Sequence, residues 1–149
     1  MTARILVDTN VLIYSYDRAD PVKQHRALSV LDELTTREAG ALTTQILGEF
    51  LVTVVRKPAV PLPLEGALDE VARYLRSWHI LDVTSRVVEE AIRGVRAYCL
   101  NYWDAQIWAA ARVYGLSAIF SEDFAIGAEL EGVHFINPLA PSFQTADWL

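Results

Sequence analysis

Short apolar runs rich in β-branched residues alternate along this chain with longer segments whose apolar residues recur at helical spacing. The pattern predicts strands over residues 5–7, 41–44, 79–83, 117–121 and 133–136. It predicts helices over residues 11–16, 21–37, 45–56, 64–78, 85–98, 104–114 and 124–130, with a proline-rich bend over residues 57–63. Strands that alternate with helices in this way are typical of a parallel sheet covered on both faces. We therefore predict an α/β protein, an α/β/α sandwich around a central parallel sheet of about five strands.

The length and composition of the chain suit one folded unit. Its 149 residues predict a single domain over residues 1–149, with an irregular tail from about residue 138. Apolar types make up 52% of the residues and charged types 21%, which excludes wholesale disorder. No apolar run approaches the roughly 18 residues of a membrane span. The first residues are too soon interrupted by charge to be a secretion signal, so we expect no membrane association.

Cysteine usage and net charge narrow the classes of function. Cys99 is the only cysteine, which excludes an internal disulfide framework and a thiolate zinc cluster, and which fits a reducing cytoplasm. We expect Cys99 itself to be a small buried hydrophobic residue. The net charge is −6, so a broad electrostatic hold on nucleic acid is not expected. Any role with nucleic acid therefore has to depend on local geometry.

Several common catalytic motifs are missing from the sequence. The glycines form neither a dinucleotide-binding GxGxxG pattern nor a P-loop. The chain contains no GxSxG nucleophile motif and no HExxH zinc motif, and its three histidines are scattered. These absences leave acidic residues as the best candidates for chemistry.

Acidic side chains fall where an open α/β sheet binds its ligands, at the carboxyl ends of the strands. Asp8 directly follows the first predicted strand, and Asp123 follows the fourth. Asp104 heads an inward-facing helical stripe that continues with apolar residues at positions 107, 108 and 111. Glu49 lies in the helix after the second strand. A carboxylate that faces a core is costly unless it is paired, hydrogen-bonded or bound to a cation.

Each of these acids also has an ordinary structural interpretation. Asp8 could begin a turn, because Asp-Thr-Asn is favourable turn chemistry. Asp104 and Asp123 could cap the helices predicted at those positions. Glu49 could belong to a solvated stripe with the polar residues four positions before and after it. The functional interpretation depends on the acids sharing one edge of the sheet.

Carboxylates that converge at one edge need a compensating charge. Two unit charges about 4 Å apart repel by roughly 4 kcal/mol at an effective dielectric constant of about 20. Protons or a hard cation relieve this repulsion. Oxygen-only ligands suit Mg²⁺ or Mn²⁺, which can lower the pKa of bound water for attack on a phosphodiester. The residues by themselves therefore predict metal-dependent phosphoryl chemistry, without naming a substrate.

Four segments around these acids resemble one protein family. They are Asp8-Thr9-Asn10-Val11-Leu12-Ile13-Tyr14, Thr44-Gln45-Ile46-Leu47-Gly48-Glu49-Phe50, Tyr102-Trp103-Asp104-Ala105-Gln106-Ile107-Trp108-Ala109-Ala110-Ala111 and Ser121-Glu122-Asp123-Phe124. In type and order they are similar to the four acidic blocks of PIN domains, and more narrowly to those of VapC-type toxins of prokaryotic toxin–antitoxin pairs. The likeness runs from Ile5 to Pro138. It implies a PIN fold and the activity of a Mg²⁺- or Mn²⁺-dependent endoribonuclease.

The resemblance also implies roles for individual residues. Asp8, Glu49, Asp104 and Asp123, called the four acids below, would form the catalytic pocket. Its metal ligands would be Asp8, Asp104 and Asp123. Asp8 and Asp104 are the first choices for direct contact, whereas Glu49 and Asp123 could act through water or orient the nucleophile.

Three neighbouring residues complete this picture. Asn10 and Ser121 match polar helpers of the family, which would hold the carboxylates in place by hydrogen bonds. Ser121 could instead make ordinary hydrogen bonds at the end of a strand. Glu122 stands next to Asp123, and we expect it to point away from the pocket.

The same resemblance implies partners. They are an RNA substrate, a small cognate antitoxin that lays a helix in a groove, and a second copy of the chain in a homodimer. Trp78, Tyr102 and Trp103 are candidates for such contacts, although we expect each of them first to pack in the core. Arginines of residues 85–98 could contact phosphate or form a solvated helix face. The residues that contact RNA are not predicted.

Two other functions compete with a ribonuclease toxin. The first is a catalytically silent PIN module that binds RNA or a protein. The second is a metal-dependent phosphatase with Asp8 as covalent nucleophile, although such enzymes usually carry a second aspartate where this chain has Asn10.

Overall fold

A computed structural model describes residues 4–57, 61–124 and 127–149. Within these residues, six strands form one sheet in the order β3-β2-β1-β4-β6-β5. The strands are β1 (Ile5–Val7), β2 (Gly40–Thr43), β3 (His79–Leu81), β4 (Ala118–Phe120), β5 (Glu129–Leu130) and β6 (Val133–Ile136). The first five in that order are parallel, and β5 pairs antiparallel with β6. The predicted parallel sheet of about five strands is therefore confirmed, with a short antiparallel strand added at one edge.

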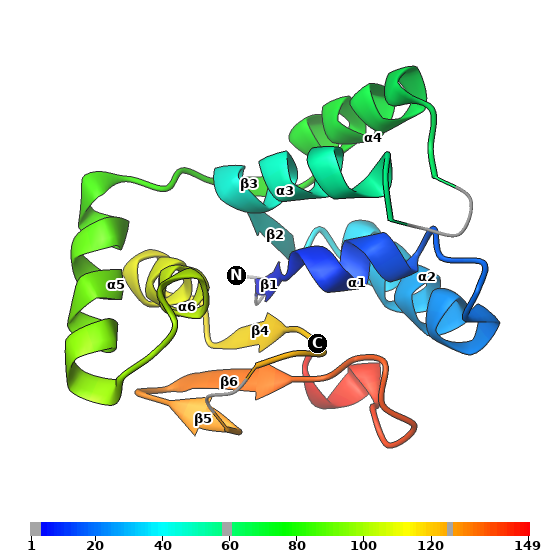
Figure 1. Cartoon of the computed structure of the whole chain (residues 1–149). Helices are drawn as coiled ribbons and strands as arrows, with labels where there is room; N and C mark the ends of the chain where they lie inside the picture. Colours follow the sequence, from blue (N-terminus) through cyan, green and yellow to red (C-terminus); the bar gives the residue numbers. More distant parts are fainter. Residues whose placement is uncertain (1–3, 58–60, 125–126) are drawn as a thin grey trace.

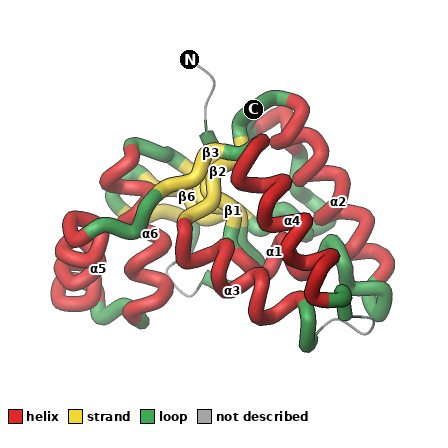
Figure 2. Tube along the Cα trace, turned by 90° about the horizontal axis from the view of Figure 1, so that it is seen from above, coloured by secondary structure: helices red, strands yellow, loops and turns green. Residues whose placement is uncertain are grey.

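Helices cover both faces of this sheet. They are α1 (Thr9–Tyr14), α2 (Pro21–Thr36), α3 (Thr44–Val54), α4 (Leu64–Ser77), α5 (Ser85–Tyr98), α6 (Tyr102–Tyr114) and a 3-10 turn, η1 (Thr145–Asp147). Helices α5 and α6 pack against each other on one side of the strands, whereas α1, α2 and α4 lie on the other side (Figures 1 and 2). The predicted α/β/α sandwich is confirmed. None of the helices described is both long and apolar enough to cross a membrane.

Side-chain caps set where most of the helices begin. Asp20, Thr43, Thr84 and Asn101 each accept a hydrogen bond from a backbone N–H two or three residues further on. Such caps satisfy N–H groups that have no partner inside the helix. The cap at Asn101 starts α6 two residues earlier than predicted, so the prediction that Asp104 could be the cap is wrong.

Two predictions about local structure are wrong for identifiable reasons. The predicted helix over residues 124–130 is not formed at its end, where Glu129–Leu130 make β5; residues 125 and 126 lie outside the described part. A tight turn follows at once, with Glu131 and Gly132 at φ values of 48° and 85°. This turn brings the chain back as β6. Cys99 is exposed rather than buried, because it caps the C-terminal end of α5 beyond the stripe of buried residues Val87, Ala91 and Gly94; its φ is 54°.

The three aromatic candidates for core packing behave differently. Trp78 is buried, and its indole Nε1 donates to Thr35 Oγ1 at 2.9 Å. Tyr102 is half-buried. Trp103 is 54% exposed, so the prediction that it packs in the core is wrong. The inward positions of α6 are instead filled by Ile107, Trp108 and the alanines around them.

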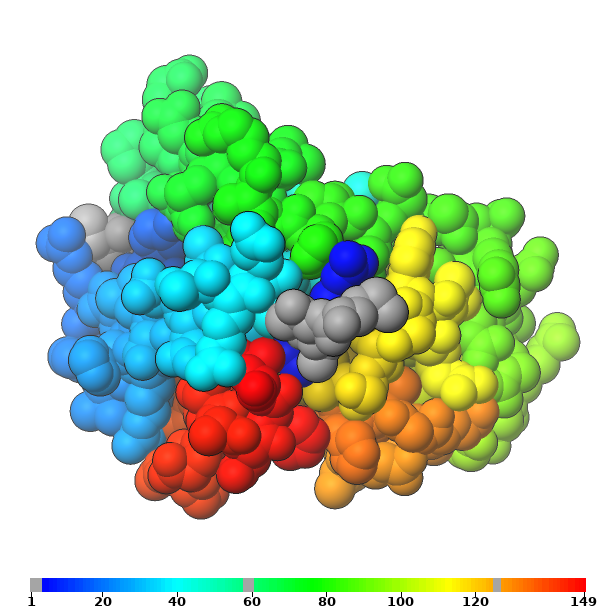
Figure 3. Space-filling view, turned by 180° about the vertical axis from the view of Figure 1, so that it is seen from behind, coloured from blue at the N-terminus to red at the C-terminus, as the bar shows by residue number. Residues whose placement is uncertain are grey.

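The C-terminal segment packs against the body of the molecule. Figure 3 shows this segment seated beside α2. Arg26 of α2 donates a hydrogen bond from Nη1 to the Leu139 carbonyl at 2.8 Å. The Phe143 ring meets Phe120 of β4 edge to face, with ring centroids 5.3 Å apart. The predicted tail from about residue 138 is therefore largely irregular, as expected, but it closes over one end of the core.

A close approach between α5 and α6 depends on the absence of a side chain at Gly94. A Cβ atom at this position would lie 2.7 Å from Cζ3 of Trp108, which is fully buried. The small residue therefore lets α5 pack directly on the indole ring.

We predict that Gly94→Ala lowers the free energy of unfolding by about 1–3 kcal/mol, because the buried ring has to shift. Gly48→Ala is the matched control in another helix, since a Cβ there meets no heavy atom within 4 Å among the described residues outside its own turn. It should raise stability by about 0.5–1 kcal/mol. Urea unfolding measures both, and equal changes in the two variants would contradict the packing argument.

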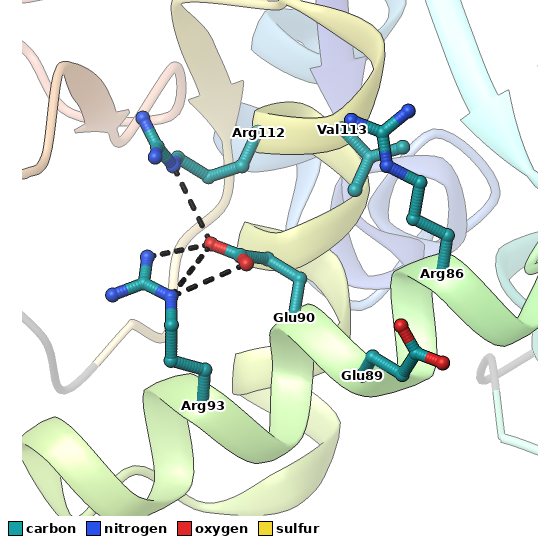
Figure 4. Close-up of a pocket in the computed structure, with 6 residues that line it drawn as sticks. All are labelled: Arg86, Glu89, Glu90, Arg93, Arg112 and Val113. Atoms are coloured by element: carbon teal, nitrogen blue, oxygen red, sulfur yellow. Dashed lines mark hydrogen bonds and ion pairs between the residues drawn. The ribbon is translucent and has the colours of Figure 1, made fainter.

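A cluster of charged side chains joins α5, α6 and the turn between β5 and β6. Arg93 Nη2 lies 2.6 Å from Glu90 Oε1 and 2.9 Å from Glu131 Oε1. Arg112 of α6 approaches the same two carboxylates. Figure 4 shows Arg93 and Arg112 turned toward Glu90. These three residues line a hollow of about 290 Å³. Hydrogen bonds from Arg93 hold the pKa of both glutamates below their ordinary value of 4.5.

This shift predicts that the cluster contributes stability only while the glutamates are charged. Arg93→Gln should lower the free energy of unfolding at neutral pH, and its difference from wild type should close as pH falls through the lowered pKa values, below 4.5. Arg96→Gln, an exposed position on the same helix, is the control and should show little change with pH. Denaturant unfolding across this pH range is the measurement, and a constant Arg93→Gln difference would contradict the prediction.

Candidate active site

The carboxyl ends of β1 and β4 lie side by side and carry the centre of the site. Val7 and Phe120 are partners in the parallel pairing, and the Asp8 N–H donates to the Phe120 carbonyl at 2.9 Å. Asp8 therefore follows β1 at the point where Ser121 follows β4. Its carboxylate Oδ1 accepts from the Thr9 N–H at 2.7 Å and caps α1. Asp8 therefore caps a helix rather than starting a turn, and this role uses only one of its two oxygens.

The Ser121 hydroxyl is the centre of the hydrogen bonding. It donates to Asp8 Oδ2 at 2.8 Å and accepts from Asn10 Nδ2 at 3.0 Å and from the Asp123 N–H at 3.2 Å. The Asn10 amide oxygen accepts from the Glu122 N–H at 3.3 Å. Asn10 and Ser121 therefore contact the carboxylate of Asp8 and the backbone that carries Asp123, where the sequence placed two polar helpers.

Glu49 reaches the same region from α3. Its Oε2 accepts from Thr9 Oγ1 at 3.0 Å, and its Oε1 accepts from Gln45 Nε2 at 3.1 Å. Thr9 thus binds Asp8 through its backbone and Glu49 through its side chain. Neither Thr9 nor Gln45 was predicted to be a site residue. The available signal was their position, since Thr9 stands between two site residues and Gln45 lies one helical turn before Glu49.

Asp104 enters the site from the first turn of α6. The residues below it on the same helix face are buried, with Ile107 8% exposed and Trp108 and Ala111 fully enclosed. Asp104 is half-buried at the top of this stripe. Burial raises the pKa of its carboxyl, and the charge of Asp123 raises it further.

The charges of the four acids act on one another. Burial raises the pKa of Asp8, and the nearby charges of Glu49 and Asp104 raise it further, against the hydrogen bonds from Ser121 and Thr9 that lower it. Asp104 is coupled in the same way to Asp123. Asp8 is therefore near the charges of Glu49 and Asp104, and Asp104 is near that of Asp123, although the sequence spreads these residues over more than a hundred positions.

Glu122 turns toward α1 and α2. Its Oε2 lies 2.7 Å from Lys23 Nζ, and its Oε1 accepts from the Tyr14 hydroxyl at 2.9 Å. Its charge is balanced there by a lysine, whereas the neighbouring Asp123 faces the groove described next. The two adjacent acids thus have separate surroundings.

A groove of about 460 Å³ begins at the acids and continues along α1. Asp8 and Asp123 line one part of it. Further along, the lining residues include Ile13, Tyr14, Asp17, Thr53 and Lys57. Asn10, Ile13, Tyr14 and Asp17 recur at helical spacing, so this face was visible in the sequence, although it was not singled out there.

The donor atoms of the site fit a hard divalent cation in type and charge. They are carboxylate oxygens, and their mutual repulsion and burial would be relieved by positive charge. Among residues 4–57, 61–124 and 127–149, no three His, Cys, Asp or Glu side chains are grouped as ligands of one ion. Mg²⁺ is often held by only one or two carboxylates together with water and substrate phosphate. Two carboxylates, such as those of Asp8 and Asp104, are therefore sufficient in number.

The geometry defines a class of protein: an α/β/α sandwich with an acidic groove at the carboxyl edge of its parallel sheet. A family model for the PIN domain matches residues 5–127 of the chain. The chain belongs to the PIN domain family, and the resemblance seen in its four acidic segments is confirmed at that level. A search of curated proteins finds no match.

Solved structures with the same fold include toxins of toxin–antitoxin systems. A toxin–antitoxin complex from Klebsiella pneumoniae is 18% identical, with a TM-score of 0.65 over 90% of this chain and 97% of that chain. VapC20 of Mycobacterium tuberculosis, a sarcin-ricin loop cleaving toxin, is 18% identical, with a TM-score of 0.64 over 83% and 93%. DNA-bound VapBC from Salmonella typhimurium is 16% identical, with a TM-score of 0.64 over 92% and 99%. At this identity the likeness shows the fold alone.

The central position of Ser121 gives a testable stability effect. Ser121→Ala removes the donor to Asp8 and the acceptor for Asn10, and we predict a loss of about 1–3 kcal/mol in the free energy of unfolding. Ser117→Ala, at an exposed position just before β4, should stay within about 0.5 kcal/mol of wild type. Equal effects of the two substitutions in urea unfolding would contradict the assigned role of Ser121.

Proposed function

We propose that this protein is a metal-dependent endoribonuclease that acts as the toxin of a toxin–antitoxin pair and hydrolyses RNA phosphodiester bonds at the four acids. The observation that carries the proposal is a network of hydrogen bonds in a PIN domain that joins Asp8, Glu49 and the backbone of Asp123 through Thr9 and Ser121, with Asp104 near enough for its charge to act on Asp8. Folding alone gives no reason to bring like charges together in this way, because their repulsion destabilises the chain.

Asp8 and Asp104 are the residues that would hold Mg²⁺ or Mn²⁺ directly, and Asp123, proposed from the sequence as a further ligand, would act on the ion through water. A bound divalent ion supplies positive charge for the phosphate and acidifies water. Thr9 and Ser121 orient the Asp8 carboxylate by hydrogen bonds to separate oxygens. Glu49, fixed by Thr9 and Gln45, is placed to orient the attacking water or to accept its proton.

The proposed partners follow from the same fold. Toxin–antitoxin complexes are among the solved structures that share it, which supports a cognate antitoxin as the protein partner. We propose that the protein acts on cellular RNA in the cytoplasm and forms a homodimer. The phosphatase alternative has no support from the site, because the position two residues after Asp8 is an asparagine, where such enzymes usually carry a second aspartate.

We predict that Asp8→Asn and Asp104→Asn each lower the rate of RNA cleavage by at least about 100-fold, since each removes a charge from the metal site. The assay uses purified protein, Mn²⁺ or Mg²⁺ and a panel of RNAs, and chelation by EDTA should stop cleavage by wild type. Asp69→Asn, an exposed aspartate on α4, is the matched control and should cleave as wild type does.

Two outcomes would contradict this proposal. If both variants at the acids cut as fast as wild type, the acids are not the catalytic groups. If wild type binds RNA but cuts no member of the panel with either metal, the protein is a silent PIN module. Thermal melts show that a loss of cleavage does not come from unfolding.

A further inference from the structure

We propose that the groove along α1 binds one unpaired nucleotide of the RNA next to the scissile phosphate, with its base stacked on Tyr14 and its phosphate held by Lys57. The inference rests on the proposed ribonuclease function and names residues that determine how the substrate is held. It starts from the continuity of the groove, which runs from Asp8 and Asp123 to Tyr14 and Lys57.

The Tyr14 ring is held firmly before any ligand arrives. Its hydroxyl donates to Glu122 Oε1 at 2.9 Å, and the ammonium of Lys23 lies 4.9 Å from the ring centroid. Lys23 is in turn paired with Glu122 at 2.7 Å. The hydrogen bond holds the hydroxyl of Tyr14, and the Lys23 ammonium lies over one face of its ring. The residue also lines the groove. A ring held in this way loses little conformational entropy when a base stacks on it.

Lys57 provides positive charge on the same groove. It is exposed, and within residues 4–57, 61–124 and 127–149 no carboxylate forms an ion pair with it. Lys23, in contrast, is already neutralised by Glu122. In a protein of net charge −6, a free ammonium beside the acids is a natural contact for RNA phosphate.

The chemistry of the groove favours an unpaired nucleotide over a duplex. A base can stack on a side chain only when it leaves the stack of its own helix. Asp17 also lines the groove and would repel phosphate, but its carboxylate can accept hydrogen bonds from N–H groups of a base. The groove therefore offers an aromatic face, a cation and an acceptor, which together match the base and phosphate of one nucleotide.

The test measures binding separately from cleavage. Fluorescence anisotropy with a short labelled single-stranded RNA is carried out in an Asp104→Asn background, which is not expected to cut. Tyr14→Leu should weaken binding about 5- to 100-fold, the range for loss of one stacked base, whereas Tyr14→Phe keeps the ring and should stay within about 3-fold. A duplex of the same sequence should bind more weakly than the single strand.

The cation is tested by a matched charge removal. Lys57→Gln should weaken binding and reduce the salt dependence, the slope of log K against log salt, by about 0.7. Arg76→Gln removes the same charge from the last turn of α4. This turn lies at the amino end of β3, whereas the groove lies at the carboxyl ends of the strands, so the slope should stay unchanged. Thermal melts of every variant report folding.

The outcomes separate this inference from the proposed function. Equal binding by Tyr14→Leu and Tyr14→Phe, or equal salt slopes for Lys57→Gln and Arg76→Gln, would overturn the nucleotide site. If wild type still cleaves RNA in those cases, the proposed ribonuclease function stands. If wild type neither binds nor cleaves RNA, both proposals fall.

Discussion

The hydroxyl of Ser121 is the contact on which the arrangement of the acidic site depends. It joins Asp8, at the end of β1, to Asn10 in α1 and to the backbone of Asp123 after β4. These groups meet because β1 and β4 pair in parallel with Val7 opposite Phe120. A shift of that register by one residue would turn every side chain of the strand to the other face of the sheet. Pairing of the strands thus determines where the charges lie.

The electrostatics of the site oppose folding and favour a ligand. Burial and the charges of Glu49 and Asp104 make the anionic form of Asp8 unfavourable, while hydrogen bonds from Thr9 and Ser121 stabilise it. In the cluster around Arg93, by contrast, the carboxylates of Glu90 and Glu131 are paired with arginine. Conflict between charge and stability at one place in an otherwise consistent fold is characteristic of a functional site.

Much of the fold was predictable because five strands are short apolar runs bounded by polar or turn-forming residues. The first of these runs, for example, stops at Asp8. The remaining errors have physical causes. Strand β5 is two residues long, too short for a periodic pattern, and Cys99 is exposed because it lies at the C-terminal cap of α5, beyond the buried face of that helix. The positions of the acids followed from the strands, but the bond from Thr9 to Glu49 did not. It joins residues 40 positions apart, and only the packing of α1 on α3 creates it.

The two outer strands of the sheet are short. At one edge β3 has three residues, and at the other β5 has two, so each offers few free backbone groups for pairing with an added strand. In the described part of the chain, the edge strands are therefore poor sites for strand pairing between molecules. A partner that binds the helical faces would instead be selected by side chains rather than by main-chain hydrogen bonds.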